Sequence, residues 1–318
     1  MRLDGHTLVG AAERGCVTAL SQWHALLSER IKWHAREAWV LPVMALRALS
    51  TRKGPAALAV LQWVFRTATR QVGSSTSRLQ LPPLLLTVLA FKCASIGDFD
   101  TFRWLYADGR QLTKQDIQAQ VSVAGLKAFK QAMGPFGGAD KGVLPFMRVK
   151  NAAVTYTLMD TALGYGQGEF VTLLSRSAVG APLATLTHLS AVLAAHSGSR
   201  SLLQWLHAHT GCTFNNSKVI AQCLKTRSGP RPWSGDEAIA HNALDALKWL
   251  RDIGAFQART QTDLTDMIVS TAEYHATRPH VAYPVRLQWL LREMGAEWPD
   301  GGAARIVRAV AHDRQAPD

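Results

Sequence analysis

A Trp-Leu pair followed by a glycine recurs through this sequence and constrains the fold more than any other feature. The four clear copies are Trp104-Leu105 with Gly109, Trp205-Leu206 with Gly211, Trp249-Leu250 with Gly254, and Trp289-Leu290 with Gly295. With weaker echoes at Trp23 and Trp63, the successive tryptophans lie 40, 41, 101, 44 and 40 residues apart. A local pattern that returns about every 40 residues predicts a stacked repeat architecture. In such arrays each unit contacts only its neighbours, and function depends on a surface that the units build together.

A second pattern, two small residues followed by a glycine, comes before most of these pairs. It occurs as Ala11-Ala12 with Gly15, Cys93-Ala94 with Gly97, and Ala194-Ala195 with Gly198, while Asn242 takes the glycine position in a fourth copy. Gly and Asn both tolerate the left-handed backbone found at helix ends. We therefore expect the first helix of each unit to end at these positions.

A second helix is predicted to follow each of these turns. After Gly97 come Thr101, Phe102, Trp104 and Leu105, a spacing that forms one apolar stripe on a helix. The same spacing leads to the other tryptophans, so we expect Trp104, Trp205, Trp249 and Trp289 to lie in the core. These second helices are expected to end at Gly109, Gly211, Gly254 and Gly295. Each unit is then a helix–turn–helix that cannot bury its apolar face alone.

These residues resemble the ankyrin repeat family, whose units run A-A-x-x-G, an apolar pair, L-L and then G-A. Asn242, Trp249-Leu250 and Gly254-Ala255 fall at the family's offsets, as do Gly97, Trp104-Leu105 and Gly109. The resemblance implies an all-α, ankyrin-like solenoid of stacked antiparallel helix pairs. It also implies a non-catalytic scaffold for protein–protein interaction that binds through the first helices and loop tips. The family's T-P-L-H opening is missing, and the period exceeds the usual value of about 33 residues.

The pattern predicts one solenoid over residues 1–311, built from about six to eight degenerate units, followed by a frayed tail at 312–318. Residues 110–160 and 212–236 fit the repeat poorly, and a generic solenoid of helical hairpins is the alternative fold.

The charge is unevenly distributed. Of the net charge of +12, residues 1–97 contribute +8, from 12 Lys and Arg against 4 Asp and Glu. A strongly basic surface attracts polyanions. The alternative function is therefore an RNA- or ribonucleoprotein-associated subunit, whose binding weakens steeply with salt. The predicted polyanion contacts are Arg47, Arg52, Lys53, Arg66, Arg70 and Arg78.

The motifs give little support to catalysis. Gly164, Gly166 and Gly168 lack the preceding strand and the following Lys-Ser/Thr that a phosphate-binding loop needs. His207 and His209 lie two apart, on opposite faces of a helix, and cannot hold one metal ion together with Cys212. We therefore predict no enzyme, no cofactor, no metal site and no small-molecule substrate.

The remaining composition bears on location. The four cysteines form no C-x-x-C pair, which favours a reducing, intracellular setting. The longest apolar stretch is too short to cross a membrane. A cytoplasmic or nuclear protein is expected, with an organelle left open, and its most favoured partner is another protein.

Overall fold

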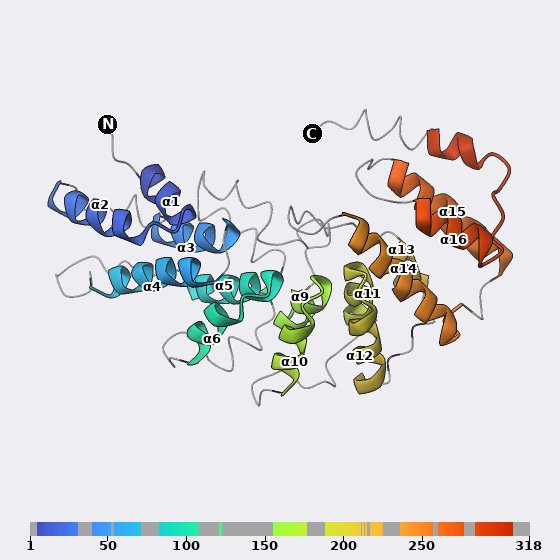
Figure 1. Ribbon diagram of the computed structural model, residues 1–318, viewed down its shortest axis with the longest axis horizontal. Helices are drawn as coiled ribbons and strands as arrows, with labels where there is room; N and C mark the ends of the chain where they lie inside the picture. The colour runs from blue at the N-terminus through green and yellow to red at the C-terminus, as the bar shows by residue number, and fades with distance from the viewer. Residues whose placement is uncertain are drawn as a thin grey trace. The chain divides into compact units, whose positions relative to one another are not determined.

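The computed structural model (Figure 1) is helical over nearly all of the chain that it describes. The described residues are 5–30, 40–51, 54–70, 83–107, 121–122, 155–176, 188–210, 212, 214, 217–224, 236–256, 260–276 and 284–307. Two residues of β1 (Val121–Ser122) pair antiparallel with two of β2 (Thr155–Tyr156). The all-α class expected from the sequence is confirmed. The tail predicted at 312–318 lies outside the described residues.

The chain divides into two compact units. Unit 1 comprises Met1–Ala162 and Glu169–Ala181, and unit 2 comprises Leu163–Gly168 and Pro182–Asp318. The boundary passes through α9 (Leu158–Gly164). A single continuous array over residues 1–311 stays a prediction.

In unit 1, alternate helices pack against one another. Its helices are α1 (Gly5–Glu13), α2 (Val17–Arg30), α3 (Val40–Thr51), α4 (Pro55–Arg70), α5 (Pro83–Ile96), α6 (Phe99–Ala107) and almost all of α10 (Gly168–Arg176). α1 contacts α3 and α3 contacts α5, while α2 contacts α4 and α4 contacts α6. Within pairs, α1 contacts α2, α3 contacts α4 and α5 contacts α6. First helices therefore pack on first helices, and second helices on second helices.

Unit 2 repeats this arrangement. Its helices are α11 (His188–Ser197), α12 (Arg200–Thr210), α13 (Ser217–Leu224), α14 (Asp236–Asp252), α15 (Gln261–Ala276) and α16 (Pro284–Arg292). α13 contacts both α11 and α15, while α14 contacts both α12 and α16. Residues 302–307 are also helical, and Arg305 Nε donates to Glu273 Oε1 of α15 at 3.3 Å.

Glycine ends the first helices where the sequence predicts it. Gly15, Gly97 and Gly198 have φ angles of 69°, 70° and 69°. After α1, Gly15 N–H donates to the Ala12 carbonyl at 3.0 Å and Cys16 N–H to the Ala11 carbonyl at 3.0 Å. This pair of bonds is the Schellman motif, in which a left-handed residue satisfies the last carbonyls of a helix.

The prediction that Asn242 ends a first helix is wrong. α14 runs without a break from Asp236 to Asp252 and includes Asn242. The first helix of that pair is α13, which lies in the segment that fitted the repeat poorly. Asn tolerates a left-handed backbone but does not require one, and it costs less than about 0.7 kcal/mol inside a helix. The surrounding Ala, Leu and Lys residues favour continuation.

Two of the first helices begin with a Thr-x-x-Asp capping box, in place of the T-P-L-H opening that is typical of ankyrin repeats and missing from this sequence. At α9, Thr157 N–H donates to Asp160 Oδ2 at 3.0 Å, and Asp160 N–H donates to Thr157 Oγ1 at 3.1 Å. Thr260 and Asp263 make the same reciprocal bonds at the start of α15. Each box satisfies two backbone donors that a helix start leaves open.

The core of unit 1 is concentrated in its first helices. Between Val40 and Leu49 in α3, every side chain except Arg47 is buried, and residues 87–95 of α5 are all buried. A helix that is apolar around its whole circumference is buried on all sides. Among the described helices, none combines the length and the apolar character needed to cross a bilayer.

Candidate interaction site on the second helices

The burial of α3 and α5 decides which side of unit 1 a partner can reach. The sequence resemblance implies binding through first helices and loop tips, but these two helices offer almost no accessible side chain. The second helices α4 and α6 are amphipathic and keep exposed side chains, among them Arg66 and Arg103. Among the described helices of this unit, the candidate interaction site therefore lies on the second helices; residues 31–39, 71–82 and 108–120, which connect the helix pairs, lie outside the described residues.

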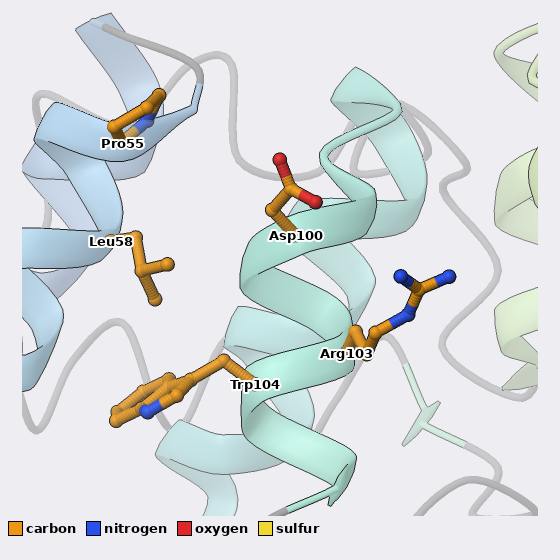
Figure 2. Close-up of a pocket in the computed structure, with 5 residues that line it drawn as sticks. All are labelled: Pro55, Leu58, Asp100, Arg103 and Trp104. Atoms are coloured by element: carbon orange, nitrogen blue, oxygen red, sulfur yellow. The ribbon is translucent and has the colours of Figure 1, made fainter.

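A shallow groove of about 340 Å³ lies between α4 and α6. We call it the α4–α6 groove, and Figure 2 shows the residues that line it: Pro55, Leu58, Asp100, Arg103 and Trp104. Leu58 and Trp104 approach the space from opposite helices. Its walls are mostly apolar, with charged groups only from the first two turns of α6.

One end of the α4–α6 groove is fixed by a buried aspartate. Asp98 precedes α6, and its Oδ1 accepts from Thr101 N–H at 3.1 Å while its Oδ2 accepts from the Thr101 hydroxyl at 2.9 Å. This is an N-cap, which satisfies backbone donors at the helix start. Asp98 Oδ2 also accepts from Gly54 N–H at 3.4 Å, just before α4 begins at Pro55. Asp98 thus joins the two turns from which α4 and α6 begin.

The other end is fixed by an aromatic pair. Phe65 of α4 and Trp104 of α6 meet edge to face, with ring centroids 5.6 Å apart and an interplanar angle of 73°. Such pairs add to the energy of burial and prefer this geometry. Because both ends are tied, the groove is held in shape without a ligand.

The four repeat tryptophans differ in burial. Trp249 and Trp289 are 8% and 3% exposed, whereas Trp104 and Trp205 are half-buried. Trp249 is covered by Phe214 and His207, whose ring centroids lie 5.6 and 5.9 Å away. Trp205 stacks on His209 of its own helix at 4.6 Å. Two members of the pattern therefore belong to the core, and two keep part of an indole accessible.

The repeat glycines are described in part. Gly254 and Gly295 have φ angles of 81° and 65°, shortly after the ends of α14 and α16. Gly109 and Gly211 lie outside the described residues.

The predicted polyanion contacts do not form one exposed surface in the part of the chain that is described. Arg47 Nη1 pairs with Glu13 Oε1 at 3.1 Å, and its side chain is 20% exposed. Arg66 is exposed, and Arg70 lies in α4 without a described side chain. Arg52, Lys53 and Arg78 lie outside the described residues. Lys92, another cation of the basic third, is buried.

The two histidines considered as metal ligands in the sequence, His207 and His209, each lie within hydrogen-bond distance of a backbone carbonyl. His207 Nδ1 lies 3.2 Å from the Cys212 carbonyl, and His209 Nδ1 lies 2.8 Å from the Trp205 carbonyl. Among the described residues, no three His, Cys, Asp or Glu side chains gather as metal ligands would. Gly166, with a φ of 73°, lies in the turn between α9 and α10, where Gly164 ends one helix and Gly168 begins the next.

Two buried ionisable groups meet in the core of unit 2. Arg286 of α16 is 0% exposed, and its Nη1 donates to the carbonyl of Leu224, the last residue of α13, at 3.0 Å. A cation is favourable at a helix C-terminus. Burial lowers the pKa of Arg286. Burial also raises the pKa of the nearby Cys223 thiol to about 12, although Arg286 opposes the shift.

A second buried thiol lies in unit 1. Burial raises the pKa of Cys93 well above its ordinary value, and the Asp98 carboxylate adds to the shift. A thiol acts as a nucleophile only as the thiolate. Cys93 and Cys223 are therefore inert core residues near neutral pH.

Compared with known proteins, the chain matches no family model, and no curated protein and no solved structure is significantly similar to it. The candidate site therefore stands on its geometry alone.

Proposed function

We propose that this protein is a non-catalytic, ankyrin-like scaffold of stacked helix pairs that binds another protein through its second helices. The carrying observation is the packing of first helices on first helices and second on second in each unit. Such packing supports the proposal, because stacked helical hairpins contact their neighbours in this way and present an extended surface to a partner.

The distribution of exposed groups supports this proposal. Trp104 and Trp205 leave part of an indole accessible on second helices, and aromatic residues are enriched at protein interfaces. Trp298, which follows α16, is 42% exposed. All four cysteines are free, which supports a reducing, intracellular place of action.

The decisive experiment is affinity purification of the tagged full-length protein from its source cells, with and without nuclease, read by mass spectrometry. We expect protein partners that persist after nuclease treatment, because a preformed protein surface needs no nucleic acid. A matched purification of Arg66→Gln tests the polyanion alternative, because Arg66 is the one predicted polyanion contact that is exposed among the described residues; we expect its partners to stay nuclease-resistant.

The opposite result would support the RNA alternative. Partners that all vanish with nuclease, and that weaken with Arg66→Gln and with rising salt, would contradict the scaffold proposal.

A further inference from the structure

Two oppositely charged side chains, Asp100 and Arg103, line the α4–α6 groove. Figure 2 shows the Asp100 carboxylate at the edge of the space between α4 and α6, while the Arg103 side chain extends away from Leu58 and Trp104. Within the described chain, Asp100 has no hydrogen-bond or ion-pair partner, and Arg103 has no ion-pair partner. The groove thus combines two apolar walls, an indole and one available carboxylate.

We propose that the α4–α6 groove binds a cationic side chain, arginine or lysine, presented by a partner protein. The aliphatic stem lies between Leu58 and Trp104, and the charged head reaches Asp100. This inference rests on the proposed scaffold function and names the chemistry that one of its contacts recognises.

The indole and the carboxylate favour the same occupant. The indole offers an apolar wall to the stem, and a guanidinium or ammonium donates charge-assisted hydrogen bonds to a carboxylate. Lysine and arginine also carry apolar stems that pack along apolar surface while the head stays polar. One arginine or lysine side chain can therefore pack its stem against the apolar walls and direct its charged head to Asp100 at the edge.

The other occupants fit less well. An acidic side chain would be repelled by Asp100. A purely apolar side chain would contact the walls but would leave the exposed Asp100 carboxylate without an added interaction. Arg103 weakens the binding of any cation, because it adds positive charge near the site.

The groove is large enough to admit an arginine or lysine side chain. About 340 Å³ is near the lower limit of ligand pockets. Because Asp98 and the Phe65–Trp104 pair fix its two ends, little ordering is required when a side chain enters.

The test uses four capped pentapeptides, each with Arg, Lys, Leu or Glu at the centre and two alanines on either side. Each peptide is titrated into the ¹⁵N-labelled full-length protein. The readout is the indole N–H resonance of Trp104, assigned by its loss in Trp104→Phe. We expect the Arg and Lys peptides to shift this resonance and the Glu peptide to leave it unchanged.

Two exposed neighbours provide opposite changes. Asp100→Asn should weaken the Arg peptide about two- to fivefold, and Arg103→Gln should strengthen it by a similar factor, as expected for exposed charge pairs. Unchanged far-ultraviolet circular dichroism and unchanged indole resonances elsewhere show that each variant is folded.

Three results would overturn the proposal. The first is that the Glu peptide binds and that Arg103→Gln abolishes its binding. The second is that the Leu and Arg peptides bind equally well and that Asp100→Asn alters neither affinity. The third is that no peptide shifts the Trp104 resonance. The failure of the scaffold function is separate, because it is read from nuclease-resistant partners of the unmodified protein. Partners that Asp100→Asn and Trp104→Phe both retain would leave the scaffold standing and place its contact outside this groove.

Discussion

Replacing Trp249 with alanine tests whether the repeat pattern marks the core. The indole is 8% exposed and is packed against Phe214 and His207. A tryptophan buries about 150–250 Å², and at about 25 cal/mol per Å² this area corresponds to ~4–6 kcal/mol. That figure is an upper bound, because the unfolded chain already buries part of the ring. We expect Trp249→Ala to lower the free energy of unfolding by about 3–5 kcal/mol.

Trp205 supplies the matched control, since it occupies the same repeat position on α12 but is only half-buried. Trp205→Ala should cost about half as much, in proportion to the area lost. Urea unfolding of the full-length variants, followed by circular dichroism at 222 nm, measures both. Hydrogen exchange shows whether α12–α16 lose protection while α3 and α5 keep theirs. A loss below about 1 kcal/mol for Trp249→Ala, or an equal loss for Trp205→Ala, would refute the reasoning.

Four further predictions address a turn, the α6 cap beside the groove, and the thiols. Gly254→Val should lower the free energy of unfolding by about 1–3 kcal/mol, because φ is 81° there; Gly254→Asn should cost less in the same urea assay. Asp98→Ala should lower the free energy of unfolding by about 0.5–2 kcal/mol, because it removes the N-cap of α6. Asp100→Ala, at an exposed position two residues later, should change it by less than about 0.5 kcal/mol. Equal losses in the two variants would contradict the role of the cap. At pH 8, iodoacetamide should label the exposed Cys16 and spare Cys223 until the chain unfolds, as read by peptide mass spectrometry. Burial raises the Cys223 pKa from 9.0 to about 12, so the protonated thiol contributes fully to the free energy of unfolding below pH 9. This contribution is lost as the pH rises toward 12. The free energy of unfolding of Cys223→Ala, measured over the same pH series, should therefore lack that part of the decline.

Several local features could be read from the sequence because they depend on near neighbours alone. Gly15, Gly97 and Gly198 end helices as predicted, since a residue without a side chain in a left-handed turn is a local requirement. Asn242 shows the limit of that reasoning: it permits a helix end without imposing one, and α14 continues through it. The pairing of α13 with α14 was missed, because α13 lacks the two small residues followed by a glycine that mark α1, α5 and α11.

The depth of each tryptophan could not be read from spacing. Trp104, Trp205, Trp249 and Trp289 share one local pattern, but the groups that cover their rings differ in origin. Phe214 and His207 pack against Trp249, whereas Trp104 meets Phe65 and also lines the α4–α6 groove. The groove itself escaped prediction, since Leu58 and Trp104 are far apart in the chain.

The sequence by itself determined that this chain is helical, where many of its helices end, and that its units must pack to bury their apolar stripes. These properties follow from backbone preferences and from the period of apolar residues, which are local. Only the tertiary structure decided that α3 and α5 are inaccessible, that Arg47 is paired with Glu13, and that Asp100 and Trp104 stand beside Leu58. Those outcomes depend on which surfaces remain uncovered after helices pack, and no single segment of sequence carries that information.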